Sequence, residues 1–383
     1  MKATNLILAI ILLATFAGCK QTNQNNDLIT VDVSKSYPQK ELLLQDFMDV
    51  EYIPLETTDE FITQGFVRSV GKNILLVTNR IIDGDIFVFD RKTGKGLRKI
   101  NRFGQSGEEY TQINEIVLDE EKNELFVVNY TARKILVYDL NGNFNRSFNF
   151  VDTSHYIHTF NYDRDNLICF KSYSPSVENE QAKHILISKQ DGVITHEIQI
   201  TVKQNESPVW MKDEAVITPS FCLTALCQDN WLLTRTSSDT VYTYSPDKTI
   251  HPFMTRTPSI HTMEPQVFLF PTVITEQYVF MQALKKEFDL ERMKGFPVTD
   301  LLYDKQEKAI FEYSIYNDDF INKKSVYFGS NSISREIAQH QLLQSSDLVE
   351  AYKKGELKGK LKEIASELEE EDNPVIMLIK HKK

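Results

Sequence analysis

Two glycine-containing stretches carry most of the charged residues that could do chemistry in this chain. The first, "NRIIDGDIF", contains Arg80, Asp83 and Asp85. Calcium takes about six to eight oxygen ligands, so one Asp-Gly-Asp fragment is more typical of a turn than of a metal site. We therefore predict no metal and no cofactor, and keep a structural or axial calcium ion as the alternative.

The second stretch, "NRFGQSGEEYT", contains Arg102, Glu108 and Glu109 around Gly104 and Gly107. Its glycines could suggest a phosphate-binding loop, but a dinucleotide loop needs a strand before it and a helix after it. Strand-like patterns lie on both sides here. We therefore interpret the stretch as a joint between repeated units, in which the two glycines allow a positive φ. Aromatic residues at both ends of the loop are expected to hold this joint in place.

Five segments with the pattern of a β-hairpin recur about every 50 to 60 residues. Each has an alternating strand, a turn containing polar or glycine residues, and a second strand. Two further strand-like runs precede each hairpin, and four strands per repeat are typical of a propeller blade. The hairpins begin at Ile86, Ile135, Ile185, Val241 and Asp300.

Strands left over at the two ends of the chain predict how the ring closes. The segments "SVYFGSNSI" and "NPVIMLIKHKK" lack partners near the C-terminus, and "LITVDVSK" at 28–35 lacks a blade of its own. If strand 28–35 completes the last blade, no sheet edge stays open at the seam. The predicted fold is therefore all-β, a six-bladed β-propeller over 28–383.

A short helical insertion is predicted in the last blade at about 346–371. Leu357, Leu361, Ile364 and Leu368 recur at helical spacing, which gives one apolar face. The insertion either packs across the ring or binds a partner.

One face of such a ring would carry both the joints between blades and the loops between the middle strands, and this face is the expected binding site. Mixed charges beside an aromatic residue suit a polar ligand or a peptide, and a solvated loop surface is the alternative. Three other polar residues, Arg68, Asn114 and His158, are expected to line the axial channel. The residues expected on the face are Arg80, Asp83, Asp85, Arg102, Glu108, Glu109, Tyr130 and Arg133.

The N-terminus predicts export. Lys2 and the apolar run from Leu6 to Ala17 form a signal peptide over 1–18 that is too short for a comfortable membrane span. The ending "FAGC" resembles a bacterial lipobox, which makes Cys19 the lipidated residue, followed by a polar tether over 19–27. Cleavage near Ala17 without lipid is the alternative. Lys20 after the cysteine resembles lipoproteins of the outer membrane in Gram-negative bacteria.

Net charge and cysteine content limit the kinds of partner and of cross-link that are expected. A net charge of −11 gives no support for nucleic-acid binding and suits a monomeric surface. After removal of the signal peptide three cysteines remain, too few for a disulfide framework in an exported chain. Cys222 and Cys227 are interpreted as core residues, with a disulfide between them left open.

The sequence "FGQSGEEYTQINEIVLDEEKNELFVVNYTARKILVYDLNGNF" is similar to NHL-type repeats. Together with "VEYIPLETTDE" and "NPVIMLIKHK", it resembles the six-bladed β-propeller lipoproteins of Bacteroides-type bacteria. This resemblance implies a propeller fold and an envelope location, and it implies no particular reaction.

Two functional hypotheses follow. The first is a non-catalytic module, held to the membrane by its lipid, that binds an envelope protein, a peptide or a glycan. The second is an enzyme, a lyase, lactonase or hydrolase, with an axial metal or acid/base site. No GxSxG or HExxH motif is present, which favours the first hypothesis. A site assembled from several blades would leave no local motif.

Overall fold

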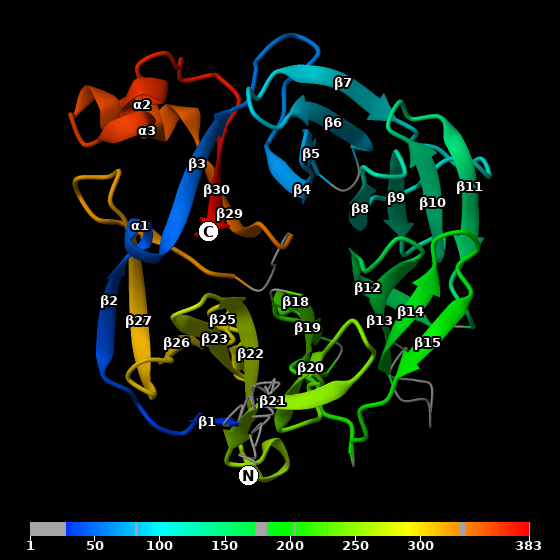
Figure 1. Cartoon of the computed structure of the whole chain (residues 1–383), viewed down its shortest axis with the longest axis vertical. Helices are drawn as coiled ribbons and strands as arrows, with labels where there is room; N and C mark the ends of the chain where they lie inside the picture. Colours follow the sequence, from blue (N-terminus) through cyan, green and yellow to red (C-terminus); the bar gives the residue numbers. More distant parts are fainter. Residues whose placement is uncertain are drawn as a thin grey trace, which may run out of the picture.

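The computed structural model describes residues 28–80, 83–152, 154–172, 182–202, 204–213, 215–227, 229–329 and 334–382. The signal peptide, Cys19 and the tether lie outside these residues. Six sheets are arranged as a ring (Figure 1). The predicted six-bladed β-propeller is confirmed.

Blades 1 to 3 are four-stranded antiparallel sheets built from consecutive strands. Blade 1 contains β4 (Phe66–Val70), β5 (Ile74–Thr78), β6 (Asp85–Asp90) and β7 (Gly96–Asn101). Blade 2 contains β8 (Glu115–Asp119), β9 (Glu124–Asn129), β10 (Lys134–Asp139) and β11 (Phe144–Asn149). Blade 3 contains β12 (His155–Asn161), β13 (Asn166–Ser172), β14 (Lys183–Ser188) and β15 (Ile194–Ile198).

Blade 4 carries one additional strand, blade 5 carries two, and blade 6 has three strands in all. Blade 4 contains β18 (Thr224–Cys227), β19 (Asn230–Leu233), β20 (Thr240–Tyr244), β21 (Ile250–Thr257) and, on its edge, β1 (Ile29–Asp32). Blade 5 contains β22 (Val267–Ile274), β23 (Tyr278–Lys285), β26 (Val298–Asp304), β27 (Ala309–Asn317), β2 (Gln39–Leu43) and β28 (Lys324–Val326). Blade 6 contains β29 (Ile337–Leu343), β30 (Val375–His381) and β3 (Met48–Pro54). Short helical turns α1 (Leu44–Phe47) and η1 (Ile260–Thr262) lie between blades.

Burial follows the position of each strand in its blade. The middle strands β5, β9 and β14 are buried along almost their whole length, because neighbouring blades cover both of their faces. The outer strands β7 and β11 alternate between buried and accessible residues, as strands with one solvated face do.

The predicted closure of the ring by strand 28–35 is wrong. β1 pairs in parallel with β21 of blade 4, and β2 pairs in parallel with β27 of blade 5. The strand that completes the last blade is β3, which pairs with β30 over seven residues. The N-terminal segment therefore runs along three successive blades. Residues 28–35 alternate as any edge strand does, so their pattern could not specify a blade.

A recurring contact joins neighbouring blades. The turn before the outer strand of one blade presses a glycine with positive φ onto the outer strand of the preceding blade. Gly192 lies against Phe148 and Gly142 lies against Ile100 in this way. At the seam of the ring, Gly94 lies against Pro54 at the end of β3. β3 thus takes the role of an outer strand.

The insertion in blade 6 consists of two short helices, α2 (Ser345–Lys353) and α3 (Gly359–Ala365), in place of a continuous run over 346–371. Gly355, with a φ of 70°, separates them. Buried Leu348, Leu357 and Leu361 pack the pair onto blade 6 beside Val375.

Cys169, Cys222 and Cys227 are buried and have free thiols. No helix among the described residues is long and apolar enough to cross a membrane.

We predict that Gly192→Ala lowers the free energy of unfolding by about 3 kcal/mol, because the new Cβ brings both backbone strain and a steric clash. The φ of Gly192 is 75°, and a Cβ there would lie 2.2 Å from Cδ2 of Phe148. Gly355→Ala is the matched control, since its φ is 70° and no atom lies within 4 Å of the new Cβ. The control should cost about 1 kcal/mol in urea unfolding. Equal costs for the two variants would show that the contact between blades adds nothing.

Candidate functional site

The loops predicted to form one face of the ring do lie at the same end of the blades. In each of blades 1 and 2, the second and third strands are joined at the end where the chain crosses to the next blade. Arg80 and Asp83 lie between β5 and β6, and Asp85 begins β6. The joint from β7 to β8 carries Arg102, Glu108 and Glu109, and Tyr130 and Arg133 lie between β9 and β10.

Two of these charged groups, Asp85 and Arg102, are held by neighbouring parts of the ring. Asp85 accepts a hydrogen bond of 2.7 Å from Nδ2 of Asn101 and pairs with Lys99 at 2.9 Å. Nε of Arg102 donates to the carbonyl of Gly142 at 2.8 Å. Among the described residues, no group of three or more His, Cys, Asp and Glu could hold a metal ion. A metal at Asp83 and Asp85 therefore has no further ligands of these types in the described loops.

The joint between blades 1 and 2 depends on Tyr110. Its ring is fully buried, and its hydroxyl donates to the carbonyl of Gly84 at 2.7 Å. Phe103 pairs with Tyr110 through a backbone bridge but stays half exposed.

The prediction of positive φ at Gly104 and Gly107 is wrong. A Cβ on Gly104 would lie 2.1 Å from Oε2 of Glu109, so the glycine makes room for this carboxylate. Hydrogen bonds from Ser106, chiefly from its backbone N–H, lower the pKa of Glu109.

A carboxylate that the sequence analysis missed, Glu115, connects the predicted axial residues. Its Oε1 accepts hydrogen bonds from the Tyr130 hydroxyl at 2.6 Å and from the His158 N–H at 2.7 Å. Its Oε2 accepts from the Thr159 N–H at 2.8 Å. Arg68 of blade 1 interacts with it electrostatically. Glu115 thus links the innermost strands of three blades.

A β-bulge makes this link possible. The pairing of β12 with β13 shifts between Ile157 and Phe160, and His158 has a φ of 52°. The bulge leaves two successive N–H groups free of the ladder, and both point to Glu115. Nearby, Oδ1 of Asn114 accepts from the Tyr130 N–H at 2.8 Å. No local motif marks Glu115, because two of its three donors lie in another blade.

The two histidines beside this cluster are engaged in structural contacts. Nδ1 of His158 accepts a hydrogen bond from the Leu223 N–H at 3.2 Å, and Nε2 of His184 bonds the Leu223 carbonyl at 3.0 Å. Burial lowers the pKa of His158 and lowers that of His184 to about 3. Phe170 contacts His184, and Phe221 contacts His158. These histidines are neutral groups in an apolar setting at neutral pH.

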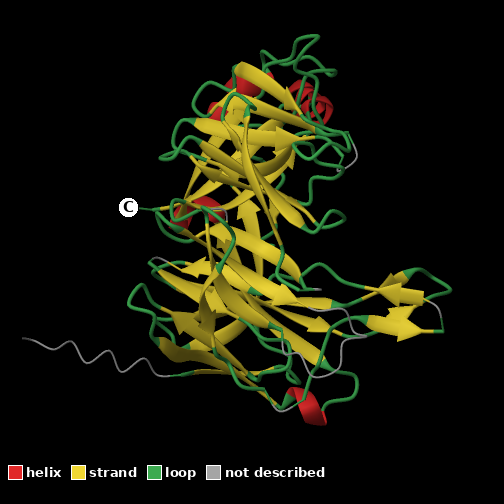
Figure 2. Cartoon of the chain, turned by 90° about the vertical axis from the view of Figure 1, so that its right-hand side faces the viewer, coloured by secondary structure: helices red, strands yellow, loops and turns green. Residues whose placement is uncertain are grey.

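Two further hairpins, also missed by the sequence analysis, project from the ring and are visible at the right of Figure 2. One consists of β16 (Trp210–Lys212) and β17 (Ala215–Ile217) in the joint between blades 3 and 4. The other consists of β24 (Phe288–Asp289) and β25 (Lys294–Gly295), between the second and third strands of blade 5. We call them together the hairpin arm.

The hairpin arm exposes apolar side chains. Trp210 and Phe288 join its two halves, with ring centroids 5.5 Å apart. The exposed fractions are 64% for Met211, 65% for Val216 and 71% for Met293. By its topology the arm belongs to the same face as Arg102 and Arg133.

Comparison with known proteins identifies the family. A family described as "DUF5128: 6-bladed beta-propeller" matches residues 20–338. The chain belongs to this family. No curated protein matches the chain.

The fold of this DUF5128 member is shared by a solved structure from Bacteroides fragilis, and two other solved structures are less similar. A Bacteroides fragilis protein with the provisional description of an exported protein superposes with a TM-score of 0.62 at 15% identity, over 93% of this chain and 100% of that one. A DUF4221 member from Bacteroides vulgatus gives a TM-score of 0.43 at 9% identity, over 72% and 90% of the two chains. Virginiamycin B lyase from Staphylococcus aureus gives 0.37 at 11% identity, over 66% and 74%.

We predict that the stability of this DUF5128 protein falls as the pH drops from 7 to 5, partly through His184. The pKa of His184 is lowered from 6.5 to about 3 by burial, so below pH 6.5 the unfolded chain binds a proton that the folded chain does not. The stability from this group is complete above its unfolded pKa and decreases as the pH falls, by about 2 kcal/mol at pH 5.

In His184→Gln, the decrease between pH 7 and pH 5 should be smaller than in the native protein by about 2 kcal/mol. Urea unfolding at the two pH values measures it, and the exposed His251 replaced by Gln serves as the control. An unchanged decrease in His184→Gln would contradict a neutral buried histidine.

Proposed function

We propose that this protein is a lipoprotein of the bacterial cell envelope whose propeller binds a partner protein through the hairpin arm. The observation that carries the proposal is the exposure of Met211, Val216 and Met293 on two contacting hairpins. Large apolar side chains gathered on a projecting element of a water-soluble domain are typical of a protein-binding surface.

The charges of the arm support an apolar contact. Its described residues carry three basic side chains, Lys212, Arg292 and Lys294, and three acidic ones, Asp213, Asp289 and Glu291. Because these charges are balanced within the arm, it offers little electrostatic attraction to nucleic acid or to an anionic surface. The acidic Asp213 at the turn of the first hairpin disfavours insertion into a bilayer. A peptide or a glycan bound on the neighbouring loops remains the alternative ligand class.

The enzyme hypothesis receives less support from the axial residues. Such an enzyme would need carboxylate, imidazole or amide groups from several blades that are free to act on a substrate. Glu115, Asn114 and the ring of His158 do come from two different blades, but each already bonds a backbone N–H. We therefore infer a structural role for this cluster and a binding role for the protein.

Several features support the anchored location. The lipobox-like "FAGC" precedes a polar tether, and the described chain begins with an edge strand of blade 4, close to where the tether would join. An exported relative with the same fold is consistent with this location. A lipid on Cys19 would hold the domain at a membrane, which we infer to be the outer membrane of a Gram-negative bacterium.

We predict that the double variant Met211→Ser, Met293→Ser loses the partner in a crosslinked pull-down from native membranes. Each side chain would contribute about 1.5 to 3 kcal/mol if fully buried by the partner, so recovery should fall at least about tenfold. The matched control is Val193→Ser, which changes a residue of 57% exposure in a turn of blade 3. Recovery of the same proteins in equal amounts by the double variant and the native protein would exclude the arm as the binding site.

We predict that Cys19→Ala abolishes lipid attachment and releases the protein into the soluble fraction. Labelling of cells with an alkyne fatty acid, followed by fractionation, measures both effects. Replacement of Cys169, which lies in the core, should leave the labelling intact. Persistent labelling of Cys19→Ala would refute this anchor without bearing on the hairpin arm.

A further inference from the structure

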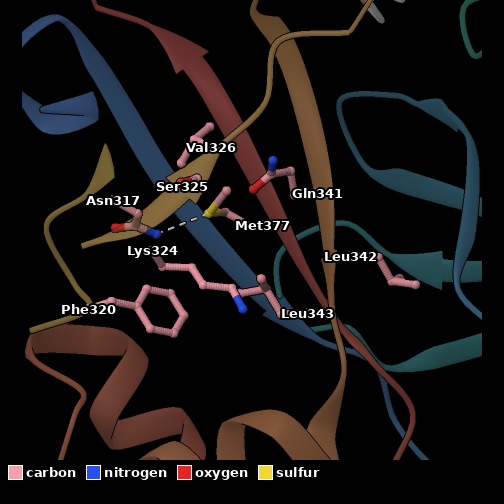
Figure 3. A pocket seen from close by; sticks show the side chains of 9 residues that line it. All are labelled: Asn317, Phe320, Lys324, Ser325, Val326, Gln341, Leu342, Leu343 and Met377. Atoms are coloured by element: carbon pink, nitrogen blue, oxygen red, sulfur yellow. Dashed lines mark hydrogen bonds between the residues drawn. The ribbon is translucent and has the colours of Figure 1, made fainter. Parts of the chain in front are cut away.

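A cavity of about 280 Å³ lies between blades 5 and 6 (Figure 3), and none of its lining residues belongs to the hairpin arm or the Glu115 cluster. Three consecutive residues of β28, Lys324 to Val326, line it on one side. Three consecutive residues of β29, Gln341 to Leu343, line it on another. Met377 of β30 and Phe320 complete the apolar part of the wall.

The polar groups of this cavity fall into two sets. Asn317 is satisfied by the protein, because its Nδ2 donates to the Tyr52 hydroxyl at 2.7 Å and its Oδ1 accepts from Gln45 at 2.6 Å. The side chains of Lys324, Ser325 and Gln341 have no hydrogen bond or ion pair with the part of the chain that the structure describes, and Lys324 and Ser325 are exposed to solvent. By contrast, the preceding Lys323 pairs with Glu41 at 2.8 Å.

The apolar wall and the polar groups of the cavity indicate what kind of ligand it could bind. The apolar wall of Phe320, Val326, Leu343 and Met377 favours an aliphatic chain over a sugar or a nucleotide. The unpaired ammonium group of Lys324 favours a carboxylate at one end of that chain, and Ser325 and Gln341 can donate further hydrogen bonds to it. The cavity is near the lower end of the range of ligand sites, about 300 to 1,000 Å³, so the ligand is small.

We propose that this cavity binds a short aliphatic chain that ends in a carboxylate, with Lys324 as the counter-ion of the carboxylate. The C-terminal residue of a peptide and a free short-chain fatty acid share this chemistry. Neither depends on the proposed role of the hairpin arm, because the two sites lie on different parts of the ring.

The test uses the full chain and three probes. The first is a fluorescent Gly-Gly-Leu peptide with a free carboxylate, the second is the same peptide with a C-terminal amide, and the third is hexanoate. Polarisation measures binding of the peptides, and calorimetry measures binding of hexanoate. At least one of the two carboxylate probes should bind saturably. The amide should bind about tenfold more weakly than the free peptide, because it cannot form the charged hydrogen bond.

Variants then assign the site. Lys324→Met should weaken binding of the carboxylate probe about tenfold, whereas Lys323→Met, which changes the adjacent paired lysine, should leave binding unchanged. Ser325→Tyr should block the cavity without removing the charge, and thermal unfolding checks that each variant folds. Tighter binding of the peptide assigns the site to peptide C-termini, and tighter binding of hexanoate assigns it to free acids. No saturable binding of either carboxylate, or equal binding by Lys324→Met and the native protein, overturns the proposal.

Discussion

The pairing of β3 with β30 is the interaction on which the rest of the ring depends. A propeller buries its sheets only when each blade has a neighbour on both sides, so the seam between the chain ends must be held as firmly as any other junction. Seven residues of β3 pair with β30, Arg91 of blade 1 pairs with Glu51 of β3, and Gly94 packs on Pro54. Before reaching β3, the same N-terminal segment adds β1 to blade 4 and β2 to blade 5. The segment next to the tether therefore runs along the outer edges of half of the ring.

The closed ring explains which segments of this protein can carry additional structure without disturbing the packing between blades. The middle strands are buried between blades, and their turns repeat the same glycine contact at successive junctions. Loops that leave the ring have no such constraint. The hairpin arm and the β28 strand both lie in such connections, one between blades 3 and 4 and within blade 5, the other between blades 5 and 6. The hairpin arm thus lies wholly in such connections, whereas the cavity lies between the β28 connection and the strands of blade 6.

The sequence predicts features whose cause is local and fails where the cause is distant. The five hairpins and their turns are visible because alternation and turn residues act within a few positions, and the structure contains all five as β6–β7, β10–β11, β14–β15, β20–β21 and β26–β27. The sequence does not predict which blade pairs with β1, since an edge strand can pair with the edge of any sheet. Glu115 is invisible as well, because its partners His158 and Thr159 lie 43 and 44 residues away. At Gly104, the sequence shows that a glycine is needed but not that the reason is the Glu109 carboxylate.

Side chains that make hydrogen bonds within the protein are assigned a structural role in this ring, and side chains without such partners are the candidates for binding. Glu115 is partly buried, and its carboxylate accepts three hydrogen bonds from two blades, which fixes the innermost strands relative to one another. Groups engaged in this way would have to break native hydrogen bonds before they could act on a substrate. In contrast, Met211 and Met293 are largely exposed, and Lys324 lacks a counter-ion among the described residues. A partner that contacts Met211, Met293 or Lys324 therefore does not have to break any of the hydrogen bonds that hold the ring together.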